Sequence, residues 1–241
     1  MRIIFHFFSF ATAIVNLIFS VRFYFRYQQS KMKTMLSCSL SSIFAFLAFI
    51  ILALPQLVLF DPTWIQIAFI SVDILLLGFV LGWSLVLLEL MEWPSYETII
   101  FKVFSYWVLI YIFLNVVFFS PSIQLVSDGE IYYWISGTLW LQSINRALLI
   151  IAALVISTVF FYWSKTFQEE KQKKLFWRVF IIGIGPIITA TAGFIFWVFP
   201  LFYFSPFLLI FSSLLGFLGF FTSFIVSVVV IRFPQEKSLK K

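Results

Sequence analysis

Seven long apolar runs constrain this chain more than any other feature of its sequence. A helix that crosses the hydrocarbon core of a bilayer needs about 20 mostly apolar residues, and each run meets that length. Proline, glycine and charged residues cluster between the runs, where such residues end helices and form turns. The runs are 3–27, 35–60, 63–88, 98–119, 136–163, 175–203 and 206–231. The sequence therefore predicts an all-α integral membrane protein built as a seven-transmembrane-helix bundle.

Charged residues are too scarce for a water-soluble surface. They make up 11% of the chain, and hydrophobic residues make up 63%, whereas soluble domains contain about 25% charged residues. The apolar runs leave no room for a separate soluble module. We therefore expect a single multi-pass membrane domain over residues 1–241. We expect it in the plasma membrane, with the lipid bilayer as its main partner.

The basic residues predict the orientation of the bundle. When the runs alternate across a membrane, 14 of the 16 lysines and arginines fall on one side. Positively charged loops stay in the cytoplasm, so we expect an outside N-terminus and a cytoplasmic C-terminus. The net charge of +6 is explained by this pattern, and no nucleic-acid partner is expected. A cytoplasmic basic face, where a protein partner could bind, comprises Arg22, Arg26, Lys171, Lys173, Lys174 and Arg178.

Cofactors and enzymatic activity are not expected. The chain has one cysteine, Cys38, and one histidine, His6, whereas a structural zinc site usually takes four such ligands. No Ser–His or Cys–His pair lies at a compatible depth. The seven-span topology resembles that of rhodopsins and G-protein-coupled receptors. Retinal proteins need a lysine in the seventh helix, and 206–231 contains none, so retinal is not expected.

Two ionisable residues lie deep inside the apolar runs. At a rise of about 1.5 Å per residue, Asp73 and Arg146 both lie roughly 5 Å to the outer side of the bilayer midplane. Ionisable groups at this depth are costly and usually pair with one another. An arginine and a carboxylate can both stay ionised when they form a hydrogen-bonded pair. The sequence therefore predicts an ion pair between the third and fifth runs.

Other polar residues surround this pair in the outer half of the bundle. The predicted ligand or ion-pair cluster is Gln66, Asp73, Asn115, Gln142, Asn145 and Arg146. Two interpretations remain open. The cluster is either a water-filled pocket that opens to the outside or a buried network that fixes the positions of the helices.

Small residues predict where helices approach each other and where one bends. Small side chains at steps of three or four residues let backbones come close in lipid. Such seams occur in the second run (Ser37, Ser41, Ala45 and Ala48) and in the seventh. The sixth run contains Gly183, Gly185 and Pro186. Proline removes a backbone hydrogen bond and bends a helix, so these residues are a candidate hinge.

Three functions fit this pattern. The first is a sensor or receptor-like protein, which perceives a stimulus at the outer cluster and passes a helix shift to a cytoplasmic or membrane partner. The second is a small transporter or channel for a polar or anionic solute, with Arg146 as the binding cation. The third is a structural subunit of a membrane complex, in which the polar groups only fix packing.

Overall fold

The computed structural model of this chain describes residues 2–53, 62–119, 139–170, 172–197 and 206–225, and within these ranges it contains helices and no strand. A short 3-10 helix, η1 (Pro94–Tyr96), lies between two of the long helices. The long helices are α1 (Arg2–Ser30), α2 (Lys33–Ala53), α4 (Pro62–Leu90), α5 (Glu97–Val117), α6 (Leu139–Glu169), α7 (Lys173–Trp197) and α8 (Pro206–Ile225). The prediction of an all-helical bundle is confirmed.

Six of these helices are long and apolar enough to cross a membrane. Where the predicted boundaries fall on described residues they lie within three residues of the helix ends, except that α6 continues to Glu169 rather than ending near residue 163. Its last turn carries Lys165 and Glu169, whose charged groups lie 4.0 Å apart, so this turn suits water rather than lipid. The apolar stretch of α8, Phe211–Thr222, is shorter than the other six. Four stretches of the predicted runs lie outside the described residues, namely 54–60, 136–138, 198–203 and 226–231.

Two short turns make sequential helices antiparallel. Lys31 follows α1 with a positive φ of 56°, and its amide donates to the Tyr27 carbonyl at 2.7 Å. Glu92 follows α4 with a φ of 58°, and the Trp93 amide beyond it donates to the Leu88 carbonyl at 2.8 Å. A left-handed residue directly after a helix is a common way to end it and satisfy its last carbonyls. The chain therefore reverses within a few residues after α1 and after α4.

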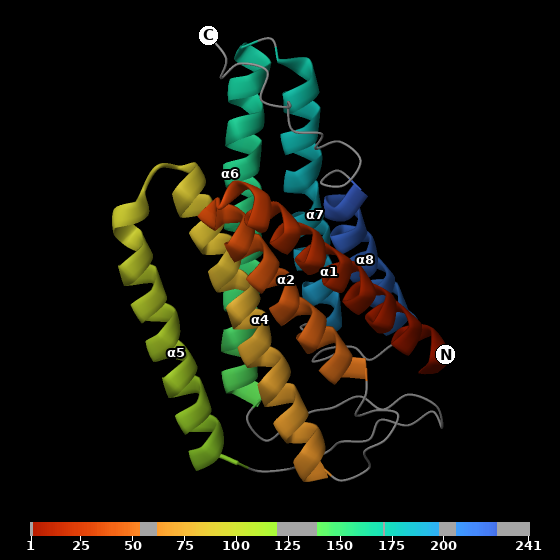
Figure 1. Ribbon diagram of the computed structural model, residues 1–241. Helices are drawn as coiled ribbons and strands as arrows, with labels where there is room; N and C mark the ends of the chain where they lie inside the picture. The colour runs from red at the N-terminus through yellow and green to blue at the C-terminus, as the bar shows by residue number, and fades with distance from the viewer. Residues whose placement is uncertain (1, 54–61, 120–138, 171, 198–205, 226–241) are drawn as a thin grey trace.

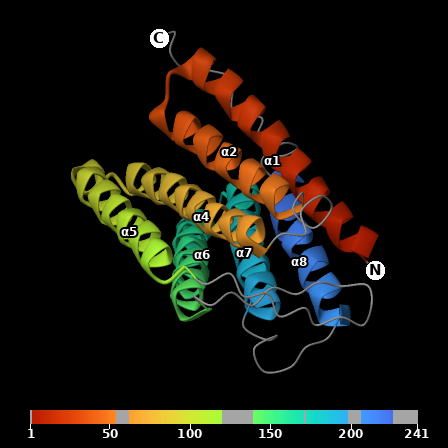
Figure 2. The same ribbon diagram turned by 90° about the horizontal axis from the view of Figure 1, so that it is seen from below.

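Six helices form a ring, and α5 lies outside it. Around the ring, neighbours pack in the order α1, α2, α4, α6, α7 and α8, and α1 closes the ring against α8. The remaining long helix, α5, packs against α4 and α6 (Figures 1 and 2). One face of α5 therefore faces the bundle, and the rest is open to the surroundings.

Aromatic and aliphatic side chains fill the inside of the ring. The Phe220 ring from α8 lies 5.3 Å from the Phe49 ring of α2 and 5.7 Å from the Phe79 ring of α4, measured between centroids. A cluster around Leu77 and Leu149 joins α4 to α6. These contacts span the ring, so the core is packed rather than hollow at this level.

Small residues bring pairs of ring helices close together. A Cβ atom at Gly82 of α4 would lie 2.6 Å from the Ser41 Cβ atom of α2, too close for any side chain. The Ser41 hydroxyl donates to the Phe79 carbonyl at 2.7 Å. Ala45 and Ala48 are also buried on α2, so the predicted packing seam of the second run is confirmed for these residues.

The candidate hinge lies in a closely packed part of α7. The helix continues through Pro186. A Cβ atom at Gly183 would lie 3.0 Å from the Phe161 ring of α6, and one at Gly219 of α8 would lie 2.9 Å from the Gly185 carbonyl oxygen. The absence of a side chain at Gly183 therefore lets α6 approach α7, and its absence at Gly219 lets α8 approach α7. A hinge motion at Gly183, Gly185 and Pro186 stays a prediction.

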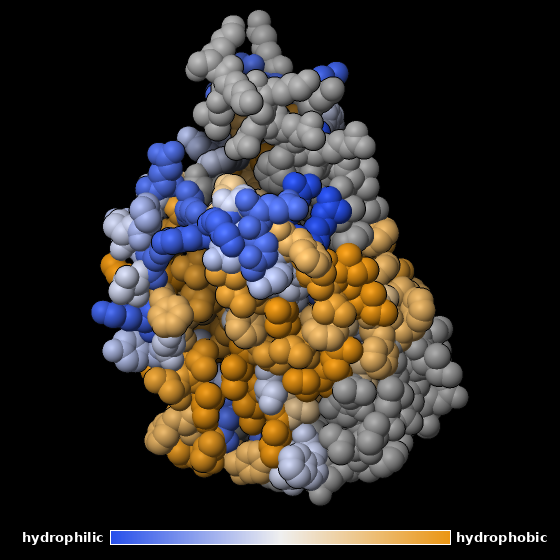
Figure 3. All heavy atoms as spheres, viewed as in Figure 1, coloured by the Kyte–Doolittle hydropathy of each residue, from blue (hydrophilic) through white to orange (hydrophobic). Residues whose placement is uncertain are grey.

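Polar and apolar side chains separate along the bundle. Figure 3 shows an apolar lower half on the visible face, whereas hydrophilic side chains gather higher, over the turns that follow α1 and α4. A membrane protein presents such an apolar band to lipid.

Candidate functional site

A buried polar network lies where α4, α5 and α6 meet. It occupies the half of the bundle that contains the start of α4, the end of α5 and the start of α6, which is the lower half in Figure 1. Its side chains are almost inaccessible, with exposed fractions between 0% and 5%. The members are Gln66 and Asp73 on α4, Tyr111 and Asn115 on α5, and Gln142, Asn145 and Arg146 on α6.

Asp73 is bound by a side chain from α5. The Tyr111 hydroxyl donates a hydrogen bond to the Asp73 Oδ2 atom, and both side chains are buried. A buried carboxylate is costly unless it is paired or hydrogen-bonded. Tyr111 therefore offsets part of the cost of burying Asp73.

Arg146 supplies the positive charge of the network. It attracts the Asp73 carboxylate and also acts electrostatically on Tyr111, so the three side chains form one interacting group. One guanidinium nitrogen of Arg146 donates to the Gln142 side-chain oxygen at 3.0 Å. The structure thus brings Asp73 and Arg146 into the same buried site, and a direct ion pair between them stays a prediction.

A second contact joins α5 to α6. The Trp107 indole nitrogen donates to the Asn145 Oδ1 atom at 3.1 Å. The Asn115 amide nitrogen donates to the Tyr111 carbonyl on its own helix at 2.8 Å. Polar side chains of α5 therefore bind both of the long helices that α5 contacts, α4 and α6.

Gln66 has unused hydrogen-bonding capacity. Its side chain is 3% exposed, and neither its amide nitrogen nor its amide oxygen has a hydrogen-bond partner among the described residues. The Asn145 Nδ2 atom is in the same situation. Native structures contain few buried polar atoms without partners, and each needs an explanation. These amides are suited to bind water or a polar ligand.

The structure buries all six residues of the predicted cluster, but their contacts differ from the expected ones. Side chains of α5 bond Asp73 and Asn145, whereas Gln142 and Arg146 bond to each other within α6 and Asn115 bonds to the backbone of its own helix. Gln66 lies on the face of α4 that also carries Asp73, two turns away. Sequence reasoning missed Tyr111 and Trp107 as direct partners. Their four-residue spacing with Asn115 was the available signal, because it places all three on one face of α5.

The predicted basic face is only partly described. Arg22 and Arg178 are half-buried on α1 and α7, and Arg26 and Lys173 are exposed. Lys171 and the Lys174 side chain lie outside the described residues.

Within the described ranges, no three His, Cys, Asp or Glu side chains are grouped closely enough to hold a metal ion.

Comparisons of this chain with protein-family models, with curated proteins and with solved structures find no match.

Proposed function

We propose that this chain is a seven-helix membrane sensor, receptor-like in character, in which α8 is the seventh span. Its N-terminus is outside and its C-terminus is in the cytoplasm, as the distribution of basic residues favours. The buried network at the α4–α5–α6 junction is the perceiving element, and α5 carries the response. The plasma membrane is the expected location.

The observation that carries this proposal is the attachment of α5. This helix lies outside the ring of six, and its outer face consists of large side chains with exposed fractions of 56–69%. Those side chains are Phe101, Val103, Tyr106, Leu109, Phe113 and Val116. A helix in this position can shift along lipid without opening the packed ring.

The polar network is suited to act as a latch on that helix. The Tyr111 and Trp107 side chains donate to Asp73 on α4 and to Asn145 on α6. A ligand that displaces Tyr111 removes the contact with Asp73, and a stimulus that protonates Asp73 weakens it, because the hydrogen bond loses its charged acceptor. The equilibrium position of α5 then changes, because the stimulus interacts differently with the two positions. A protein partner that contacts the cytoplasmic end of α5 responds to this shift.

Spin-label distances in the full chain test this mechanism. In a Cys38→Ser background, Lys102→Cys on α5 and Lys165→Cys on α6 place labels on two exposed side chains. A second pair, Lys33→Cys and Lys165→Cys, reports a distance within the ring. We expect Tyr111→Phe, which mimics release of the latch, to move the α5–α6 distance by about 2 Å or more, the scale of helix shifts in switching proteins.

The controls separate a shift of α5 from general loosening. Tyr106→Phe makes the same chemical change on the exposed face of α5 and should leave both distances unchanged. The ring distance should also stay constant in Tyr111→Phe. If the α5–α6 distance is the same in Tyr111→Phe and in the wild type, the network does not hold α5 and this proposal is wrong.

A second candidate function is transport of a polar or anionic solute. It is favoured by Gln66, whose amide atoms have no partner among the described residues, two turns from the Asp73 site. Proteoliposomes containing the full chain should then pass chloride or inorganic phosphate, and Arg146→Gln should abolish the flux while the protein remains folded. If neither flux nor a shift of α5 is found, the network fixes packing, as in a structural subunit.

A further inference from the structure

The buried network contains a hydrogen-bond donor that the described residues leave unused. The Asn145 side chain is fully buried, and its Nδ2 atom has no hydrogen-bond partner among the described residues. Its Oδ1 atom accepts a hydrogen bond from the Trp107 indole nitrogen at 3.1 Å. An indole nitrogen can only donate, so the amide cannot be turned round to bring Nδ2 to Trp107. The unused donor is therefore a feature of the site that needs an explanation.

An acceptor with spare capacity lies on the neighbouring helix α4. The Tyr111 hydroxyl donates to the Asp73 Oδ2 atom, and among the described residues no group donates to Oδ1. A carboxylate accepts about four hydrogen bonds through its two oxygens. Asp73 is 1% exposed, so bulk water does not supply the remaining donors. The network thus combines a donor on α6 with an acceptor on α4, and both have bonding capacity left.

Helix α5 places this donor and this acceptor within about one turn of each other. Trp107, which binds Asn145, and Tyr111, which binds Asp73, are four residues apart on one face of α5. They are separated by about 6 Å along the helix axis. A molecule that makes two hydrogen bonds of about 2.9 Å bridges atoms up to about 5.8 Å apart. All four side chains lie more than one turn from the ends of their helices, and α4 and α6 also pack directly against each other.

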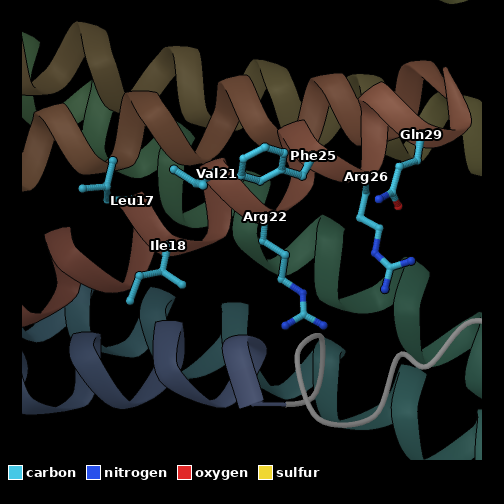
Figure 4. Close-up of a pocket in the computed structure, with 7 residues that line it drawn as sticks. All are labelled: Leu17, Ile18, Val21, Arg22, Phe25, Arg26 and Gln29. Carbon is cyan, nitrogen blue, oxygen red and sulfur yellow. The ribbon is translucent and has the colours of Figure 1, made fainter.

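The junction is enclosed, unlike a surface hollow that lies along α1. Figure 4 shows that hollow with labelled side chains that all belong to α1, among them Leu17 and Phe25, which are 40% and 62% exposed. At the junction, by contrast, Asp73 and Asn145 come from two helices and are 1% and 0% exposed. The junction therefore suits only a small molecule.

We propose that one ordered water molecule binds between Asp73 and Asn145. It accepts a hydrogen bond from Asn145 Nδ2 and donates one to Asp73 Oδ1. The Asp73 carboxylate repels an anion, and a cation cannot accept a hydrogen bond from the amide nitrogen. Water is a small neutral molecule with both capacities, and buried waters commonly satisfy such groups. The water links α4 directly to α6 and completes a hydrogen-bonded circuit through α5, whichever function the network has.

X-ray radiolysis of the full chain in detergent tests for this water. X-rays split a bound water molecule where it lies, and the hydroxyl radicals oxidise adjacent aromatic rings, which mass spectrometry locates. Tyr111 is fully buried, and we expect its ring to be oxidised nonetheless. A radical scavenger in the bulk solvent should suppress oxidation of Tyr96, which is 52% exposed in η1, and leave that of Tyr111 unchanged. Phe220, which is 8% exposed in the packed ring, should remain unoxidised.

Two variants that both remove the bond between Trp107 and Asn145 isolate the contribution of the Nδ2 donor. Asn145→Leu removes this donor and should abolish the oxidation of Tyr111, whereas Trp107→Phe keeps the donor and should retain the oxidation. Circular dichroism and monodisperse elution verify the fold of each variant. The proposal is overturned if wild-type Tyr111 is oxidised no more than Phe220, if the scavenger protects Tyr111 as it protects Tyr96, or if the two variants give the same result. None of these outcomes depends on the position of α5, so they are independent of the spin-label test.

Discussion

The Tyr111 hydroxyl donates a hydrogen bond to the Asp73 carboxylate and so joins α5, which among the described long helices lies outside the ring, to α4 within it. The bond lies in a part of the bundle where Asp73 is 1% exposed and Tyr111 is fully buried. Sequence reasoning paired this carboxylate with Arg146, whereas the hydrogen-bond partner that the structure shows for it is Tyr111. The predictions below measure how much each contact contributes.

Tyr111→Phe should lower the free energy of unfolding by about 0.5–1.7 kcal/mol. Hydrogen bonds to charged groups contribute more than neutral ones, but bonds between membrane helices average less than 1 kcal/mol and rarely exceed about 1.7 kcal/mol. SDS titration of the full chain in mixed micelles measures the change. Tyr106→Phe, at a side chain that is 64% exposed, should have no effect. Equal effects of the two substitutions would show that the hydroxyl of Tyr111 contributes nothing specific.

Asp73 and Arg146 should show strong coupling in a double-mutant cycle. Asp73→Asn or Arg146→Gln alone leaves the other charge buried without its counter-charge, which costs about 3–5 kcal/mol. The double variant should cost less than the two single changes together, by roughly 0.5–3 kcal/mol. The same SDS titration gives all four stabilities. Additive effects would exclude the proposed pairing.

Gln66→Met should raise the stability of the folded protein, whereas Gln142→Met should lower it. The two glutamines are both buried, but only Gln142 accepts a hydrogen bond from Arg146, at 3.0 Å. Burying an amide without partners costs about 1–3 kcal/mol, and methionine of similar volume removes that cost at position 66. A loss of stability in Gln66→Met would instead reveal a bound water or ligand that the amide satisfies.

Gly219→Ala should destabilise the bundle, and Gly216→Ala should not. A Cβ atom at position 219 would lie 2.9 Å from the Gly185 carbonyl oxygen of α7, so the two helices must separate. Overpacking of this kind typically costs about 1–3 kcal/mol. At position 216 the nearest atom, the Ala192 Cβ atom, is 3.7 Å away, and alanine favours the helix by up to about 1 kcal/mol. Thermal unfolding in detergent compares them. Equal melting temperatures would show that α7 and α8 do not need this close approach.

The helices could be predicted from sequence because a span in a bilayer is a local property. Its length and apolar content are read from about 20 consecutive residues, so the predicted starts of the runs fall within three residues of the helix starts. The burial of Asp73 and Arg146 was predictable for a related reason. Lipid cannot solvate these groups, so they face the inside of the bundle.

Only the tertiary structure decided which helices are neighbours and which polar groups meet. It places α5 outside the ring, brings Tyr111 to Asp73 and Trp107 to Asn145, and leaves Gln66 without a partner among the described residues. Sequence is a poor guide here because the lipid-facing and core-facing sides of a membrane helix are both apolar, so hydrophobicity does not mark the inner face. Close packing of small residues and a few interhelical hydrogen bonds select the arrangement instead, and these depend on residues far apart in the chain.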